Sequence, residues 1–333
     1  MNFFTGNAYI PNGFIANIRN FSAYNNHKTG YANLDAVQPL YPGFYVLGAI
    51  SSLGKTTFAH QMSDQIATSG TPVLYFSLEQ SALELYSKSI SRQIYKHSKS
   101  DPSYTTYSAM QIRRGEALGS KELTEQMDAY VTQVQDNMVI IECNFAVTVE
   151  MILETIASYI NTTHKIPVIF IDYLQIISPS SIGNKLLDGR AAIDHAVHTL
   201  KSFQSVNRLT IFAICSLNRQ NYLSPIDFEA FKESGGIEYT ADCVWGLQLQ
   251  CIHDEVFGKE GKLKDKREAI QKAKSAIPRE IELVVLKNRY GKTNYSCDFT
   301  YNPVFDFFEP ASTGNASQSL DDYWSSASST PFE

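Results

Sequence analysis

Hydrophobic positions along the chain gather into short runs that are apolar almost throughout. The runs cover residues 44–50, 72–78, 137–143, 167–177, 209–217, 243–250 and 281–287. Strands that are buried on both faces of a parallel sheet have this pattern, whereas strands with one wet face alternate. Stretches of helical character lie between the runs, at 55–69, 81–98, 120–136, 148–162 and 186–206. The alternation predicts right-handed βαβ units, and therefore an α/β fold with a mostly parallel central sheet flanked by helices.

Three stretches do not follow this pattern. Residues 1–28 are mixed and weakly patterned, which predicts an arm that needs a partner surface to become ordered. Residues 311–333 are rich in serine and poor in aliphatic residues, which predicts a disordered tail. Residues 253–279 are charged and helix-prone, with both signs present. We interpret them as a solvated excursion between two strands, and the alternative is a basic surface that faces a strand or a partner.

Composition narrows the class of protein. The 333 residues include 28 Lys and Arg and 34 Asp and Glu, so the net charge is −6. A negative chain is not expected to coat nucleic acid through bulk charge, although a few loops can still hold a strand. No apolar run approaches the roughly 20 residues of a membrane span, and the five cysteines form no Cys-x-x-Cys pair. We therefore expect a cytoplasmic protein without a secretory signal, a disulfide framework or a zinc ribbon.

The segment after the first apolar run carries the strongest chemical signal. It reads Ala49-Ile50-Ser51-Ser52-Leu53-Gly54-Lys55-Thr56. A strand that turns through small residues into a helix leaves backbone N–H groups free to cradle phosphate oxygens. Lys55 would reach the β- and γ-phosphates of ATP, and the Thr56 hydroxyl would hold Mg²⁺. The expected nucleotide-binding residues are Ala49, which replaces the usual first glycine, Ser51, Ser52, Leu53, Gly54, Lys55, Thr56 and Thr57.

Two carboxylates follow apolar runs that should lie near this loop. Asp172 comes directly after four apolar residues, where it can reach the Mg²⁺ shell through water. Glu79 ends the run after the first helix, where it can polarise a water for attack on the γ-phosphate. The alternative for Glu79 is an acidic cap for a helix that starts near Ser81. We favour the catalytic role because the strand order would place Glu79 beside the phosphates.

Taken in order, these residues resemble the C-terminal, RecA-like motor domain of the DnaB-type replicative helicases. The resemblance covers about residues 29–308. Its motifs are Thr29-Gly30-Tyr31 with Leu34-Asp35, Pro42-Gly43, the Ala-x4-Gly-Lys-Thr loop, Phe76-Ser77-Leu78-Glu79, Ile171-Asp172-Tyr173-Leu174-Gln175, Ser216-Leu217-Asn218-Arg219, Glu233-Ser234-Gly235-Gly236-Ile237-Glu238 with Ala241-Asp242, and Lys287-Asn288-Arg289. It implies a RecA-like P-loop NTPase domain over 29–310.

The resemblance also implies a homo-hexameric ring with ATP at the subunit boundaries. Lys287 and Arg289 match the motif whose cations act on the phosphate of a neighbouring subunit, as arginine fingers do. They alternate at a strand end, so both side chains should share one face. We expect them on an outward edge of the sheet, away from the subunit's own phosphate site. The alternative is a surface pair on an edge strand.

Two loops are candidates for binding single-stranded DNA. One candidate is the segment that matches the DNA-binding loop of the family, and it contains Lys232, Glu233, Gly235 and Gly236. Two glycines, one cation and free backbone N–H groups suit a phosphate backbone and cannot read bases. The alternative is an ordinary loop that caps the next helix. The other candidate is the loop 178–190, in which Lys185 and Arg190 are the only cations.

The chain departs from the family in two places that bear on function. The family's N-terminal helical domain, which binds primase and forms a collar, is not matched, and residues 1–28 would act as a linker arm that docks on the next subunit. The family's sensor glutamine corresponds to Ser216, whose shorter hydroxyl puts the coupling of hydrolysis to movement in question, and Asn218 is the expected substitute. We expect a primase, loader or single-strand-binding protein to be recruited by other means, as in a phage, plasmid or other mobile element.

Two functions from different classes remain. The favoured one is an ATP-dependent helicase motor that translocates on single-stranded DNA during replication. The alternative is a RecA-like regulatory or DNA-binding ATPase that assembles with ATP and does not unwind DNA. Both use the same nucleotide site and differ in the channel loops and at Ser216. A metabolic P-loop kinase is disfavoured, because it would explain neither 229–242 nor 287–289.

Overall fold

The computed structural model of the chain describes residues 10–22, 28–38, 40–178, 181–182, 185–186, 189–217, 223–234, 236–258 and 261–311. The predicted tail lies outside these ranges except for Ala311. Within the described ranges, no helix is both long enough and apolar enough to span a membrane.

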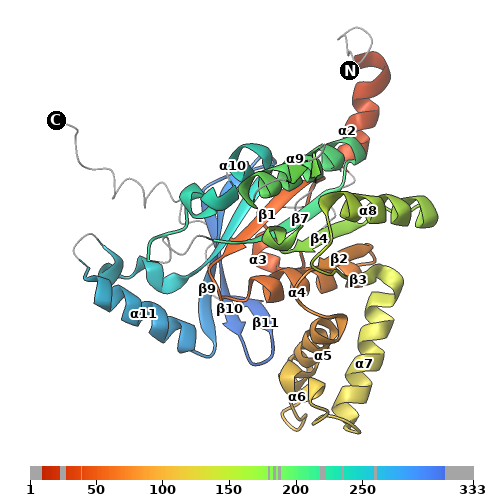
Figure 1. Cartoon of the computed structure of the whole chain (residues 1–333). Helices are drawn as coiled ribbons and strands as arrows, with labels where there is room; N and C mark the ends of the chain where they lie inside the picture. Colours follow the sequence, from red (N-terminus) through yellow and green to blue (C-terminus); the bar gives the residue numbers. More distant parts are fainter. Residues whose placement is uncertain are drawn as a thin grey trace, which may run out of the picture.

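A nine-stranded sheet forms the centre of the molecule, in the order β11-β10-β9-β8-β1-β7-β4-β2-β3 (Figure 1). The strands are β1 Gly43–Ala49, β2 Val73–Ser77, β3 Met138–Glu142, β4 Val168–Asp172, β7 Thr210–Ser216, β8 Cys243–Leu249, β9 Arg279–Asn288, β10 Tyr295–Asn302 and β11 Phe307–Pro310. β3, β2, β4, β7, β1 and β8 run parallel, and β9 to β11 join them antiparallel. The predicted α/β fold with a mostly parallel sheet is therefore confirmed.

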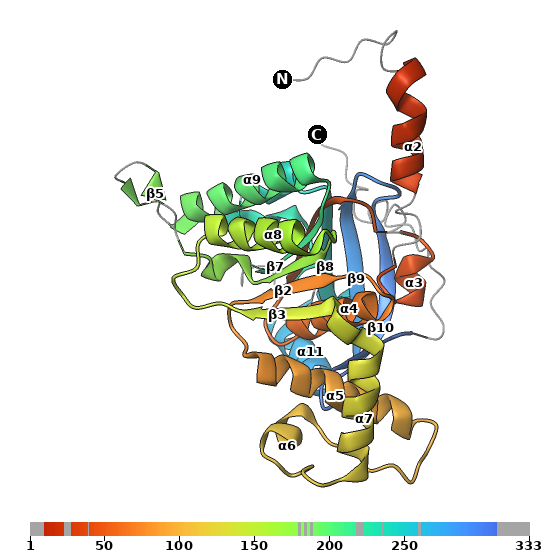
Figure 2. The same ribbon diagram turned by 90° about the vertical axis from the view of Figure 1, so that its right-hand side faces the viewer.

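Helices cover both faces of the sheet. Figures 1 and 2 show α8 and α9 on one face and α4, α5 and α7 on the other. The longer helices are α4 Lys55–Thr68, α5 Ala82–Ser98, α7 Lys121–Val134, α8 Val149–Thr163, α9 Gly189–Asn207 and α11 Leu263–Ser275. The shorter ones are α2 Ile15–Ser22, α3 Ala32–Asp35, α6 Ala109–Arg113 and α10 Ile237–Thr240, with short 3₁₀ segments that include η4 Leu174–Ile176 and η6 Phe228–Ser234. A small separate hairpin pairs β5 Ser181–Ile182 with β6 Lys185–Leu186.

The last two strands did not stand out in the hydrophobic pattern. β10 alternates between buried and half-buried residues along its length, so it contains no continuous apolar run. Such alternation is normal for an antiparallel strand with one face on the core. β10 and β11 extend the sheet beyond β9 and bring Phe299 and Phe308 against Phe58 of α4.

Aromatic side chains align the central strands. Trp245, Tyr45, Phe212, Phe170 and Tyr75 come from β8, β1, β7, β4 and β2, and neighbours in this column have ring centroids 4.7 to 5.8 Å apart. All five are fully buried. Ring contacts between adjacent strands favour one register, because a one-residue slip would turn each ring to the other face of the sheet. The register brings the carboxyl ends of these strands to a common edge.

The arm that precedes the sheet is helical in part, which the weak sequence pattern did not predict. A short π-helical segment at Ile10–Phe14 leads into α2, which projects away from the body (Figures 1 and 2). A bond of 3.4 Å from Arg208 Nη2 to Asn17 Oδ1 joins α2 to the end of α9. The described part of the arm exposes the large apolar side chains of Ile10, Phe14, Ile15 and Ile18.

Candidate nucleotide site

Four neighbouring strands end at the same edge of the sheet and carry the residues predicted to handle phosphate. The register pairs Ala49 of β1 with Ser216 of β7, and Asp172 of β4 with Ser77 of β2. Glu79 follows β2 by two residues. Ligands bind at the carboxyl edge of open parallel sheets, where the loops and helix N-termini converge. The structure therefore brings the loop after β1, Ser216, Asp172 and Glu79 to one edge, although they are far apart in sequence.

The loop between β1 and α4 has the backbone of a phosphate cradle. Ser52 and Gly54 have φ angles of 69° and 84°, and α4 begins directly afterwards at Lys55. The first N–H groups of a helix have no partner within the helix, and they favour an anion. A Cβ atom on Gly54 would lie 2.8 Å from the ring of Tyr301. Position 54 therefore needs glycine for its backbone angle and for the space beneath it.

The predicted nucleotide-binding residues differ in what they can offer a ligand. Ala49 and Leu53 have fully buried side chains, so only their backbone groups can take part. The Thr57 hydroxyl donates to Asp306 Oδ1 at 2.8 Å, so its side chain ties α4 to the β10–β11 turn. Ser51 and Ser52 lie exposed at the crest of the loop. The cradle thus depends on backbone groups together with the Lys55 and Thr56 side chains.

Lys55 contacts Ser216, the residue that we expect at the position of the family's sensor glutamine. Its Nζ atom donates to Ser216 Oγ at 3.0 Å and lies 5.0 Å from the ring centroid of Tyr173. The amide of Gln175 exchanges two hydrogen bonds of 3.2 and 3.3 Å with the backbone of Ser216. The Ser216 hydroxyl therefore reaches Lys55 directly, and the Gln175 side chain lies beside Ser216. The sequence signal for Gln175 was its position in the motif that contains Asp172. Asn218, the expected substitute for the sensor glutamine, lies outside the described residues.

Asp172 has the features of a ligand for a hard cation. Its side chain is buried, and Oδ2 accepts a hydrogen bond of 2.9 Å from the Tyr75 hydroxyl. Oδ1 is buried without a hydrogen-bond partner among the described residues. Burial raises the pKa of Asp172, and the Thr56 hydroxyl and the Lys55 charge act in the opposite direction. A bound cation would stabilise the ionised carboxylate and give Oδ1 a partner.

These groups fit Mg²⁺ in the way that nucleotide sites use it. Mg²⁺ usually takes one or two protein oxygens and fills the other positions with phosphate and water. Thr56 and Asp172 would supply those oxygens. In the described part of the chain, no group of three or more His, Cys, Asp or Glu side chains could hold a metal ion unaided. A cation at this edge would thus depend on the phosphates.

Glu79 is exposed beside this site and does not cap the next helix. The cap of α5 is made by Ser81 and Glu84, whose side chains each accept from the backbone N–H of the other. Burial raises the pKa of Asp172 and of Tyr173, and the charge of Glu79 acts in the same direction on both. The alternative role as a helix cap is therefore not supported.

Lys287 and Arg289 lie at the opposite end of the sheet from the phosphate cradle. β9 runs antiparallel to β8, pairing Ile281 with Leu249 and Asn288 with Cys243. β9 lies between β8 and β10, so the expected outer edge and the alternative of an edge strand are both wrong. The expected separation from the subunit's own phosphate site agrees with the register. What separates these cations from their own cradle is the direction of the strand.

Hydrogen bonds to a buried carboxylate and to a backbone carbonyl hold the side chains of Arg289 and Lys287 in place. Arg289 Nη1 donates to Asp242 Oδ1 at 3.1 Å, and Lys287 Nζ donates to the Glu238 carbonyl at 2.5 Å. Asp242 also accepts from Lys201 Nζ at 2.5 Å. Partial burial and the nearby Arg289 charge lower the pKa of Lys287. Sequence reasoning missed Asp242 as the anchor of Arg289, and its place in the family motif was the available signal.

The candidate DNA-binding loops are described only in part. Phe231, in η6, is buried against β1, where a Cβ atom on Gly48 would collide with its ring. The N–H of Gly236 donates to Asp194 Oδ1 at 3.1 Å, so the prediction that this loop offers free N–H groups is wrong at Gly236. Outside the described parts lie Gly235 and the side chains of Lys185, Arg190, Lys232 and Glu233.

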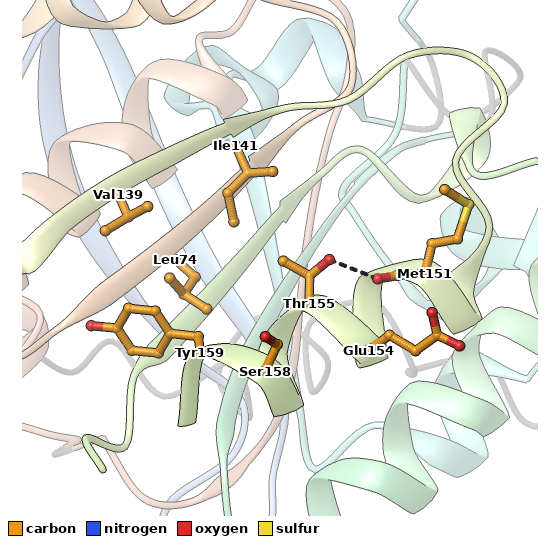
Figure 3. A pocket seen from close by; sticks show the side chains of 8 residues that line it. All are labelled: Leu74, Val139, Ile141, Met151, Glu154, Thr155, Ser158 and Tyr159. Carbon is orange, nitrogen blue, oxygen red and sulfur yellow. Dashed lines mark hydrogen bonds between the residues drawn. The ribbon is translucent and has the colours of Figure 1, made fainter. Parts of the chain in front are cut away.

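A groove at the far edge of the sheet is a different kind of surface. It has a volume of about 550 Å³ and lies between β2, β3 and α8 (Figure 3). Leu74, Val139 and Ile141 line it from the sheet, and the Thr155 hydroxyl is bonded to the backbone carbonyl of Met151 at 2.8 Å. Its lining residues include an acidic side chain and no cation, so the groove does not suit a phosphate.

A mostly parallel sheet, a phosphate cradle after β1 and acidic residues after two neighbouring strands define a P-loop nucleotide-binding domain of the RecA type. The sequence matches the DnaB-like helicase C-terminal domain over residues 27–310, and the chain belongs to that family.

Similar proteins agree with this assignment. The chain is 28% identical over 251 residues to a protein of Buchnera aphidicola named replicative DNA helicase DnaB, covering 73% of this chain and 50% of that protein. It is 25% identical over 305 residues to the protein of that name in Helicobacter pylori, covering 85% and 56%. The chain thus spans about half the length of the curated relatives it matches.

Solved structures show the same fold. A solved structure described as an ATPase domain superposes with a TM-score of 0.71 at 17% identity, covering 93% of this chain and all of that one. A DnaB-like replicative helicase, described with its interactions with primase, gives a TM-score of 0.68 at 18% identity and covers 90% of this chain and 68% of its own.

Proposed function

We propose that this chain is the motor of an ATP-dependent DNA helicase that translocates on single-stranded DNA during replication. The observation that carries the proposal is the row of groups on four adjacent strand ends: the cradle with Lys55, Ser216, Asp172 and Glu79. Lys55 would neutralise the transferring phosphoryl group of ATP. Thr56 and Asp172 would hold Mg²⁺, and Glu79 would orient the attacking water.

The proposed assembly is a homo-hexameric ring in which Lys287 and Arg289 act on a neighbour's ATP. Their position at the far end of β9 supports this, since they cannot reach their own cradle. The arm supports it as well. Ile15 and Ile18 are 55% and 48% exposed on a helix that projects from the body, and exposed apolar side chains in a group favour a protein contact. We propose that residues 1–28 dock on the next subunit.

DNA would contact the loop that contains η6 and the loop 178–190 in the channel of the ring. Phe231 supports a link between η6 and the nucleotide site, because it packs on Gly48, one residue before the last residue of β1. A primase, a loader or a single-strand-binding protein is the proposed partner class. Origin in a phage, plasmid or other mobile element belongs to the same proposal, and the genetic surroundings of the coding sequence test it.

The second candidate is an ATPase that assembles on DNA without unwinding it. The observation that favours it is the contact between Lys55 and Ser216, because we expect Ser216 at the position of the family's sensor glutamine.

A strand-displacement assay, run beside a DNA-stimulated ATPase assay, separates the two candidates. The forked substrate should be unwound with ATP by the wild-type chain and not by Glu79→Gln. DNA-stimulated hydrolysis without displacement would favour the second candidate. An absence of ATP hydrolysis, both with and without DNA, would refute both candidate functions.

A further inference from the structure

The charged stretch 253–279, for which the sequence pattern suggests a solvated excursion, lies against the phosphate cradle. Its helix, α11, packs beside β8 and β9 (Figure 1) and, although described throughout, buries none of its residues. At its C-terminal end, Lys274 Nζ donates to the carbonyl oxygen of Ser51 at 3.1 Å. Arg279, the first residue of β9, donates through Nη1 to the carbonyl oxygen of Ser52 at 2.7 Å. Two cations thus bind two consecutive peptide groups at the crest of the loop.

We propose that Lys274 and Arg279 are positioning residues of the phosphate cradle, which they hold in its binding conformation through the Ser51 and Ser52 carbonyls. This inference rests on the proposed nucleotide site. In a trans peptide, the C=O and the next N–H point in opposite directions. The Ser51 carbonyl is held toward the end of α11 and the Ser52 carbonyl toward the start of β9. The N–H groups of Ser52 and Leu53 are therefore turned away from these cations, to the side on which we propose that a phosphate binds.

Arg279 is itself fixed in place, so it can serve as a brace. Its guanidinium lies over the ring of Tyr301, 5.7 Å from the ring centroid. Tyr301 stacks on Phe308 at 4.2 Å and lies directly beneath Gly54. The guanidinium therefore contacts both the Tyr301 ring and the Ser52 carbonyl. Since Ser52 has a positive φ angle that L-residues rarely adopt, a contact on its carbonyl would help to hold a costly conformation.

Lys274 and Arg279 also make the phosphate cradle more positive. A carbonyl that accepts a hydrogen bond from a cation is polarised, and the two cations add positive charge to the loop that would bind the phosphates. Unlike Lys55, neither residue is expected to touch the ligand. Their effect should therefore fall on how tightly the phosphates bind and leave the chemical step nearly unchanged.

The test is binding of a fluorescent ATP analogue, with inorganic tripolyphosphate as competitor, by the full chain and three variants. Lys274→Ala combined with Arg279→Ala should lower the affinity for the ATP analogue and for tripolyphosphate by a similar factor, on the order of ten-fold. The KM for ATP should rise with it, while kcat changes by less than about three-fold. Arg279→Lys, paired with native Lys274, should recover most of the affinity. The matched control is Lys264→Ala, since Lys264 is on the same helix, is 81% exposed and forms an ion pair of 3.7 Å with Glu268.

The outcomes separate the inference from the proposed function. Wild-type affinity in the double variant, or loss of kcat with an unchanged KM, would overturn the brace. Weaker ATP binding with unchanged tripolyphosphate binding would overturn it too, because the effect would then lie at the base or ribose. Lys274→Ala alone, on a helix without buried residues, keeps the test open if Arg279→Ala does not fold. Failure of the wild-type chain to bind ATP would refute the proposed function itself.

Discussion

Replacing Arg289 by alanine should separate ATP binding from ATP hydrolysis. β9 runs for ten residues from Arg279, at the cradle, to Asn288. At roughly 3.3 Å per residue this places Arg289 about 30 Å from its own phosphate site. At that separation in water, two unit charges interact by only about 0.1 kcal/mol, before screening over a Debye length of about 8 Å. The affinity of Arg289→Ala for ATP should therefore change by less than about two-fold.

The turnover of the same variant should fall on the order of 10³-fold, because an arginine finger supplied in trans stabilises the transition-state charge. The fold should survive, since Asp242 keeps its bonds to Lys201 Nζ and to the Phe44 N–H at 2.5 and 2.8 Å. Thermal unfolding followed by circular dichroism checks this, and phosphate release measures turnover. Arg114→Ala, which removes an exposed arginine after α6, is the control and should behave as wild type.

Mixing experiments test the direction of the contact. Arg289→Ala subunits keep the cradle with Lys55, and Lys55→Ala subunits keep Arg289, the proposed finger. In an equal mixture, random assembly of a head-to-tail ring gives at most about one quarter of interfaces that contain both Lys55 from one subunit and Arg289 from its neighbour. Activity should therefore recover toward that fraction, and it should rise more steeply than linearly with total protein near the assembly threshold. Turnover per subunit that does not depend on concentration, with no recovery on mixing, would refute the ring and favour the regulatory ATPase.

Four further outcomes are expected. Lys55→Ala should abolish phosphate release and leave the unfolding temperature nearly unchanged, because the lysine is only partly buried, and normal turnover would remove the P-loop interpretation. Glu79→Gln should bind ATP and hydrolyse it about 10²-fold more slowly or worse, whereas normal hydrolysis would exclude Glu79 as the base. Binding to single-stranded DNA, followed by fluorescence anisotropy, should require ATP, ignore sequence and fall with a shallow salt slope, and tight binding by a monomer would contradict the channel loops. The hydrogen bond of 2.7 Å from His253 Nε2 to Glu282 raises the pKa of His253 above its usual 6.5. The hydrogen bond should therefore stabilise the fold fully below pH 6.5, and this stabilisation should be lost as the pH rises through the pKa of His253 in the folded chain. Urea unfolding of His253→Gln should then differ from wild type more at pH about 6 than at about 9, and an equal difference would contradict the pairing.

Local elements and the order of the chemical groups could be predicted from the amino-acid sequence. Continuous apolar runs placed the parallel strands, because a strand buried on both faces has little room for polar side chains. The loop before Lys55 was recognisable from its residues alone, since a strand, small residues and a helix start form a cradle within a few positions. Asp172 and Glu79 were placed correctly at the sheet edge for a related reason, because the carboxyl ends of parallel strands meet there.

Contacts between distant segments became visible only in the folded chain. β10 was missed because its alternating pattern depends on which face the core covers. The direction of β9 separates Arg289 from its own cradle and brings Arg279 to Ser52, 227 positions away in sequence. Local periodicity encodes whether a segment is a strand, but the partner and direction of that strand follow from packing of the whole sheet. For that reason the cradle could be read from the sequence, and the cations that brace it could not.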